Sequence, residues 1–81
     1  MYYTYILKSI NHDKFYIGST EDLKERVKAH NEGKSEFTKS YLPWKLVHYE
    51  AHVNKTLSRK AELFYKTSQG HRQIKKKLGL V

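Results

Sequence analysis

The sequence contains no cysteine, so the chain forms neither a disulfide framework nor a zinc site built from thiolates. This composition is compatible with a reducing compartment, and we expect a cytoplasmic protein. Long hydrophobic runs are also missing, since no apolar stretch approaches the roughly 20 residues that cross a bilayer. Near the start of the chain, Lys8 interrupts the run YYTYILKSI, which argues against a signal peptide. We therefore expect no association with a membrane.

Acidic residues are scarce in the last third of the chain. Residues 55–81 carry eight Lys and Arg and a single acid, Glu62, whereas residues 1–54 carry eight Lys and Arg and seven Asp and Glu. Most of the net charge of +8 is therefore concentrated in one segment. A basic block of this kind attracts polyanions, and nucleic acid is the partner we expect, through contacts with phosphates. The plainer alternative is a solvated surface that keeps the protein soluble.

The 81 residues are predicted to form one domain, residues 1–81. The spacing of apolar residues predicts strands and helices in the order ββαβαα. The expected strands cover residues 2–10, 15–19 and 44–53, and the expected helices are one ending near Asn31, one over residues 55–68 and a short basic one over residues 71–78. This order predicts an α+β fold in which a three-stranded antiparallel β-sheet is flanked by helices.

Capping and breaking residues set the expected ends of the helices. Thr20 is a good N-cap for the first helix, because its hydroxyl can accept a hydrogen bond from a backbone N–H of the first turn. Gly33 is expected to end that helix, and Gly70 to break the second one. The apolar stripe of the second helix is predicted to consist of Leu57, Ala61 and Phe64.

The turn NHDK between the first two strands allows the facing of their side chains to be predicted. A regular register across this even-numbered turn pairs Ile10 with Phe15 and Ser9 with Tyr16. Opposed residues share a face, and faces alternate along a strand. Tyr5 and Tyr16 are therefore expected on the same face of the sheet, although a bulge would separate them.

The first helix brings two further polar side chains close to this face. Arg26 and His30 are four residues apart and so are neighbours on the helix surface. They lie within a turn or two of the strand end that carries Tyr16, so we expect these side chains to converge with Tyr5 on one concave surface. The plainer interpretations are packing for the tyrosines, an ion pair with Asp22 for Arg26, and a favourable position near the helix C-terminus for His30.

These residues and their spacing resemble the GIY-YIG nuclease family. The segment YTY, ending at Tyr5, stands where the first family triplet stands, and YIG, beginning at Tyr16, matches the second triplet in full. The spacing of eleven residues between the tyrosines, with Arg26 ten residues later and His30 four beyond it, is similar to that of family members. Glu62, in RKAELFYKT, resembles the metal-binding glutamate of the family. The stretches YLPWKLVHYE and SQGHRQIKKKLG resemble the small, single-domain bacterial branch.

The resemblance implies a metal-dependent endonuclease that hydrolyses phosphodiester bonds in DNA, in repair or recombination, with one divalent cation such as Mg²⁺ or Mn²⁺ and no small-molecule cofactor. Arg26 would bind phosphate oxygens, and Glu62 would hold the cation. Tyr5 or Tyr16 would act as the base toward the attacking water, with help from His30, and the choice between the tyrosines stays open. We expect Glu62 to join the tyrosines, Arg26 and His30 around the same concave surface. For Glu62, the plainer interpretation is an ion pair with Arg59 and Lys66 on an exposed helix face.

Basic residues of two segments are candidates for holding the nucleic-acid backbone: Lys34, Lys39, Lys45, Arg72, Lys75, Lys76 and Lys77. Among the nearby aromatic residues, Phe37 and Tyr41 are candidates for stacking on bases, whereas Trp44 is expected in the core. Two other hypotheses stay open. One is a basic nucleic-acid-binding module without catalysis, and the other is a subunit of a larger repair assembly, with a protein partner or a second copy. Mg²⁺-dependent nicking of DNA separates the nuclease from both.

Overall fold

The computed structural model describes residues 1–79 of the chain. It confirms the predicted α+β class and the order ββαβαα, with a short 3₁₀ turn before the third strand. The sheet is antiparallel, with strand order β2-β1-β3, so the first strand lies in the middle. The elements are β1 (Tyr2–Ser9), β2 (Phe15–Thr20), α1 (Leu23–Asn31), η1 (Lys39–Tyr41), β3 (Trp44–His52), α2 (Lys55–Tyr65) and α3 (Ser68–Lys77).

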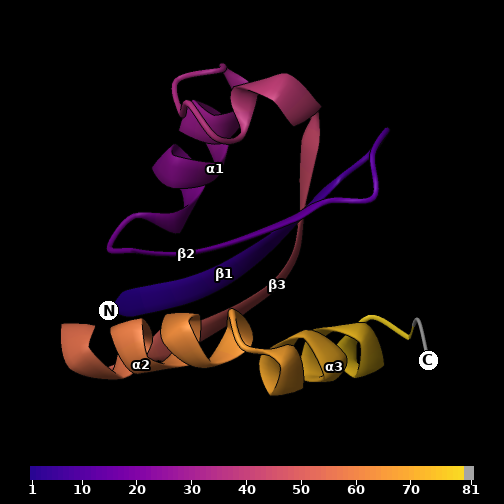
Figure 1. Cartoon of the computed structure of the whole chain (residues 1–81). Coiled ribbons are helices and arrows are strands. Elements are labelled where there is room, and N and C mark those ends of the chain that lie inside the picture. The colour runs from indigo at the N-terminus through magenta and orange to yellow at the C-terminus, as the bar shows by residue number, and fades with distance from the viewer. Residues whose placement is uncertain (80–81) are drawn as a thin grey trace.

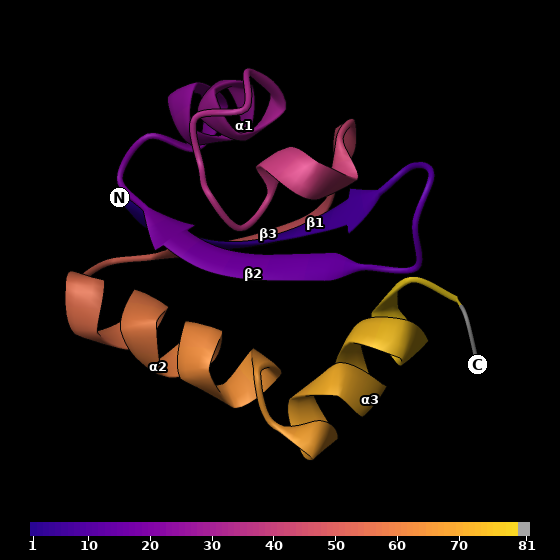
Figure 2. The same cartoon turned by 45° about the horizontal axis from the view of Figure 1, so that its top comes forward.

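The helices cover the two faces of the sheet in unequal numbers. Helix α1 packs on one face, and helices α2 and α3 pack on the other, as Figures 1 and 2 both show. Central strand β1 is therefore buried on both faces, and each face has its own apolar cluster. Beneath α1 the buried cluster comprises Tyr5, Leu7 and Trp44. Beneath α2 and α3 it comprises Ile6, Ile17, Tyr65 and Ile74.

The pairing of β1 with β2 differs from the predicted register by two residues. Lys8 pairs with Phe15 and Leu7 with Tyr16, so the expected partnership of Ile10 with Phe15 is wrong. The connecting loop is longer because Ile10 donates its N–H to the carbonyl of Pro43, beside β3. A shift of two leaves every side chain on its predicted face, since faces alternate with a period of two.

Helix α1 begins two residues later than predicted. Its N-cap is Asp22, whose carboxylate accepts a hydrogen bond from the N–H of Glu25. Thr20 remains in β2, and its hydroxyl instead accepts from the N–H of Asp22. The prediction of Thr20 as the cap is therefore wrong, because an aspartate two residues on serves the same purpose. Gly33 follows the end of the helix with φ of +76°, as expected for a glycine at such a position.

The boundary between α2 and α3 also differs from the prediction. Gly70 does not break a helix but lies in the first turn of α3, which begins at Ser68. A Cβ at Gly70 would lie 2.0 Å from the carbonyl oxygen of Phe64, so the absence of a side chain permits the tight junction. The buried residues of α2 are Ser58, Glu62 and Tyr65, while two members of the predicted stripe, Leu57 and Phe64, are exposed.

Candidate active site

Tyr5 lies under the edge of the sheet that Gly18 forms. The two residues are paired across β1 and β2, and a Cβ at Gly18 would lie 2.5 Å from the Tyr5 hydroxyl oxygen. The tyrosine ring therefore crosses β2 in a space that only glycine leaves open. This contact gives the glycine of the YIG segment a physical purpose, which is to let the Tyr5 hydroxyl reach across the edge strand.

The Tyr5 hydroxyl is fixed by a buried histidine. The hydroxyl oxygen lies 2.9 Å from Nε2 of His30, and Nδ1 of His30 lies 2.8 Å from the hydroxyl of Thr38. All three residues are buried. Burial, together with the charge of Arg26, lowers the pKa of His30 to about 4, so the imidazole is neutral at neutral pH. A neutral imidazole donates at one nitrogen and accepts at the other, which links the tyrosine to the threonine.

Burial also shifts the pKa of Tyr5, in the direction opposite to that of His30. Desolvation raises the pKa of Tyr5 to about 12, although the neighbouring Arg26 acts to lower it. At neutral pH Tyr5 therefore keeps its proton. The loss of hydration on burial outweighs the attraction of the guanidinium.

Tyr16 occupies a more open position on the same face. Its ring centroid lies 4.7 Å from that of His30, 6.2 Å from that of Tyr5 and 5.8 Å from that of Phe37. The residue is half-buried, whereas Tyr5 is 1% exposed and Phe37 is 62% exposed. Tyr16 is thus the site tyrosine that solvent reaches.

Arg26 brings a positive charge to the two tyrosines. It projects from the second turn of α1, and its side chain is exposed. Interaction with the Tyr5 hydroxyl raises the pKa of the guanidinium, and Tyr16 contributes in the same direction. Arg26 is therefore charged at every relevant pH. It offers hydrogen-bond donors to an anion beside Tyr16.

Glu62 approaches the edge strand from the opposite face of the sheet, and so does not share one surface with Tyr5 and Tyr16 as expected. It is buried in α2, and its Oε1 accepts a hydrogen bond from the hydroxyl of Ser19 at 2.7 Å. Ser19 follows Gly18 in β2, so Glu62 and the Tyr5 hydroxyl reach consecutive residues of this strand from its two sides.

Glu62 is held as an anion by the cations around it. Its Oε2 accepts a hydrogen bond from Nζ of Lys66 at 2.7 Å, and Nη1 of Arg59 lies 3.9 Å from Oε1. Burial raises the pKa of Glu62, but the hydrogen bonds from Lys66 and Ser19 and the nearby positive charges outweigh it, and the net pKa is lowered. The carboxylate is therefore ionised at neutral pH.

A single ionised carboxylate is a suitable ligand for Mg²⁺, which keeps several waters and takes further ligands from substrate phosphates. Within residues 1–79, no group of three or more His, Asp or Glu side chains is arranged to hold a metal ion. The donor set at Glu62 therefore fits a cation shared between protein, water and substrate, and does not form a closed protein cage.

A pocket of about 460 Å³ runs along the outer edge of β2. Through Tyr16 it adjoins the face of the sheet that carries the two tyrosines, which we call the tyrosine side. Through Lys66 it adjoins the face that carries Glu62, which we call the glutamate side. The lining residues are Phe15, Tyr16, Ile17, Phe37, Lys66 and His71. The sequence indicated Lys66 only as an ion-pair partner of Glu62 four residues away, and the structure contains that pair. It gave Ser19 no site role, because only the three-dimensional structure brings Ser19 to Glu62.

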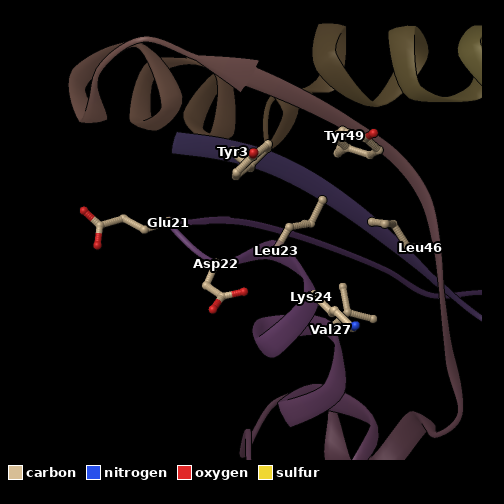
Figure 3. A pocket seen from close by; sticks show the side chains of 8 residues that line it. All are labelled: Tyr3, Glu21, Asp22, Leu23, Lys24, Val27, Leu46 and Tyr49. Atoms are coloured by element: carbon tan, nitrogen blue, oxygen red, sulfur yellow. The ribbon is translucent and has the colours of Figure 1, made fainter. Parts of the chain in front are cut away.

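A larger pocket, of about 570 Å³, lies elsewhere and contains none of the predicted site residues. Figure 3 shows it between the first turn of α1 and strands β1 and β3, with Tyr3 and Tyr49 on the sheet side and Glu21 and Asp22 at its rim. Glu21 and Asp22 outnumber the one lysine of the lining, Lys24, so the net negative charge disfavours a phosphate here.

The predicted nucleic-acid-binding residues are all exposed, but they form two groups. Lys34 lies in the loop after α1 and pairs with Glu32 at 3.2 Å, and Lys39 begins η1 and pairs with Glu36 at 3.1 Å. Lys45 is near the start of β3. Arg72 and residues 75–77 lie in α3, on the opposite face of the sheet (Figure 1). The structure thus places basic residues on both sides of the sheet, with the candidate site at the edge between them.

Comparisons with known proteins agree with this geometry. Residues 1–77 match the model of the GIY-YIG catalytic domain. A UPF0213 protein of Lacticaseibacillus paracasei is 37% identical over 73 residues, which cover 89% of this chain and 81% of the relative. A UPF0213 protein of Clostridium perfringens is 39% identical over 67 residues, covering 82% and 71%. No solved structure matches the chain. The described residues also contain no helix of the length and apolarity needed to cross a membrane. On the family match and these relatives, the chain belongs to the GIY-YIG family.

Proposed function

We propose that this protein is a cytoplasmic endonuclease of one domain that uses a divalent cation to hydrolyse phosphodiester bonds in DNA. The family supports a nuclease. The observation that carries the proposal further is the arrangement at the edge of β2. Exposed Arg26 and half-buried Tyr16 stand on one side of this strand, and ionised Glu62 stands on the other. A phosphodiester placed across this edge would meet all three groups.

Arg26 supplies the electrostatic part of the reaction. A phosphodiester is negatively charged, and further charge develops on the leaving oxygen in the transition state. The guanidinium presents several donors to phosphate oxygens and does not lose its proton. Its charge lies beside the hydroxyls of Tyr5 and Tyr16 in the free protein, where it can meet the incoming phosphate.

Tyr16 is our candidate for contact with the attacking water. Tyr5 is buried, protonated at neutral pH and engaged with His30, so its hydroxyl cannot accept a proton from water without losing its own. Tyr16 lines the pocket at the strand edge and lies beside the same histidine. In this proposal the Tyr16 hydroxyl, which solvent reaches, first gives up its own proton to bulk water, and the tyrosinate then orients the attacking water and accepts its proton, while Tyr5 and His30 are positioning residues that hold Tyr16 and Arg26 in place.

Glu62 is the residue that would hold the cation, Mg²⁺ or Mn²⁺. When bound there, the cation would polarise the phosphate and stabilise charge on the leaving oxygen. The protein's own contribution is an ionised carboxylate whose direction is fixed by the hydroxyl of Ser19.

Basic residues on both sides of the edge would hold the DNA backbone. Lys34 and Lys39 flank the tyrosine side, and Arg72 with residues 75–77 flank the glutamate side. Lys45 lies in β3, at the opposite edge of the sheet from β2, and stands apart from both groups. Exposed Phe37 offers a ring for stacking next to Tyr16. Trp44 is buried and donates from Nε1 to the carbonyl of Thr38, so it belongs to the core.

The test is nicking of supercoiled plasmid by purified protein with Mg²⁺, with EDTA, and with the Glu62→Gln variant, which keeps the shape of the side chain. The proposal expects nicking only by the wild-type protein with Mg²⁺. Salt-sensitive DNA binding without any nicking would indicate a binding module instead. Absence of both would favour a subunit of a larger repair assembly.

A further inference from the structure

Lys66 forms an ion pair with Glu62, the residue that the proposed function assigns to a divalent cation. Its Nζ donates to Oε2 of Glu62 at 2.7 Å, which is a short contact between full charges. The other oxygen, Oε1, accepts a hydrogen bond from the hydroxyl of Ser19. The positive charge nearest to the carboxylate is thus an ammonium group of the protein itself.

The pair is asymmetric in a way that lets one member leave. The Glu62 side chain is 9% exposed and is fixed by Ser19, whereas the Lys66 side chain is 49% exposed. A lysine has a long flexible stem and three donors that rotate freely, so its head can move by several ångströms without disturbing the helix. The glutamate therefore stays in place when the lysine moves.

Lys66 also borders the place to which a phosphate would come. It lines the pocket along β2 together with Tyr16, Phe37 and His71. Arg59, the other cation near Glu62, does not line that pocket, and its contact of 3.9 Å is longer. Of the two cations, only Lys66 connects the carboxylate with the open side of the site.

We propose that Lys66 holds the place of the divalent cation on Glu62 in the free protein and is released to the substrate phosphate when the cation binds. The inference rests on the proposed function, since it takes Glu62 as the cation ligand. An ammonium and a divalent cation compete for the same oxygen, so binding of one requires the other to withdraw. The exchange keeps the carboxylate paired in the free state. It also adds a positive charge at the phosphate in the loaded state.

The competition is measured by titrating the full chain with Mn²⁺ in the absence of DNA, with electron paramagnetic resonance as the readout of free Mn²⁺. Lys66→Met removes the competing charge and should tighten Mn²⁺ binding at least about threefold, given the usual worth of a partly exposed ion pair. Lys66→Arg keeps the charge and should bind close to the wild type. Lys60→Met is the matched control, because it removes the same charge from an exposed position of α2.

The release to phosphate is measured by binding of DNA in Ca²⁺, at a concentration that saturates each variant. Lys66→Met should then bind DNA more weakly than Lys60→Met, because only Lys66 borders the pocket. Circular dichroism checks that both variants are folded. Equal Mn²⁺ affinity of Lys66→Met and Lys60→Met, or equal DNA affinity of the two in Ca²⁺, overturns the inference.

Failure of the underlying function has a different signature. If Glu62→Gln binds Mn²⁺ as tightly as the wild type, Glu62 is not the cation ligand, and both proposals fall together. If Glu62→Gln loses Mn²⁺ binding while Lys66→Met behaves like the wild type, the site stands and only the exchange by Lys66 is refuted.

Discussion

At the scale of single residues, the feature with the widest consequences is His30, which is buried as a neutral imidazole. The imidazole is fully buried between Tyr5 and Thr38, and it lies close to the guanidinium of Arg26. A proton on this ring would place a second positive charge beside Arg26 in a site with little water. His30 is therefore suited to orient a tyrosine hydroxyl at neutral pH and not to exchange a proton there.

The pH dependence of folding follows from the same group. Because the pKa of His30 is lowered from 6.5 to about 4 in the folded protein, its contribution to stability is complete above pH 6.5 and is lost as the pH falls toward 4. The loss amounts to about 3 kcal/mol at most. Urea unfolding across this window should show a smaller decline in His30→Gln than in the wild type. The exposed His12→Gln should behave like the wild type, and an identical decline in His30→Gln would contradict the assignment.

The two site tyrosines are distinguished by paired substitutions. Tyr16→Phe should reduce the nicking rate by on the order of 10²–10⁴, the usual range for loss of a general base, and leave stability nearly unchanged. Tyr5→Phe should reduce activity less, but destabilise the fold by about 1–3 kcal/mol, because it removes the hydroxyl partner of a buried histidine nitrogen. Nicking rates and urea unfolding are measured for both. A larger rate loss in Tyr5→Phe at unchanged stability would reverse the two roles.

At the scale of elements, the alternation of faces was predictable from the sequence, but the register was not. A strand's parity depends only on counting residues, so Tyr5 and Tyr16 were expected on one face and are found there. The register depends on the loop, where Ile10 bonds to the carbonyl of Pro43 from a distant segment. The local sequence NHDK contains no pattern that predicts such a hydrogen bond.

Helix α2 shows the same division between local and tertiary information. Its apolar residues predicted a stripe of Leu57, Ala61 and Phe64, but the buried face includes Ser58 and Glu62. These polar residues are buried because the sheet supplies partners, Thr4 to the carbonyl of Ser58 and Ser19 to Glu62. The family resemblance pointed to Glu62, whereas hydrophobic periodicity alone would have left it on the surface.

Gly70 provides a test of the junction between α2 and α3. An alanine at a helical glycine usually stabilises by up to about 1 kcal/mol. Here the added Cβ would lie 2.0 Å from a carbonyl oxygen and 2.4 Å from the Cα of Tyr65, both backbone atoms that cannot move aside cheaply. Gly70→Ala should therefore destabilise by at least about 2 kcal/mol in urea unfolding.

The control is Gly79→Ala, where the new Cβ meets nothing within 4 Å and only the positive φ of +72° opposes it. It should cost about 1 kcal/mol. A Gly70→Ala variant as stable as the wild type would show that the two helices pack less tightly than described.

At the scale of the whole molecule, charge is distributed unevenly, and the candidate site lies at one edge of the sheet. The net charge of +8 is drawn mostly from the segment that forms α2 and α3, while acidic Glu21 and Asp22 gather near the first turn of α1. DNA binding should therefore weaken with salt, with a slope of log K against log[salt] of about −0.9 per phosphate neutralised.

Replacing residues 75–77 together by alanine should weaken binding of all DNA sequences alike and make the salt slope shallower. The measurement is a fluorescence anisotropy titration at several salt concentrations. The control replaces three lysines outside the proposed contact, Lys14, Lys24 and Lys28, and should change the slope less. Equal changes in the two triple variants would mean that only the total charge matters.

The central claim is that the residues at the edge of β2 catalyse the hydrolysis of phosphodiesters, and substitution of Arg26 tests this claim most directly. The measurement is the rate of nicking of supercoiled plasmid with Mg²⁺ by Arg26→Ala, beside Lys24→Ala, which removes another exposed cation from α1. Loss of one preorganised donor at the transition state costs on the order of 10²–10³ in rate, so Arg26→Ala should be slower by that factor while Lys24→Ala stays near the wild type. Nicking by folded Arg26→Ala at the wild-type rate would contradict the account, because the activity would then belong to another site.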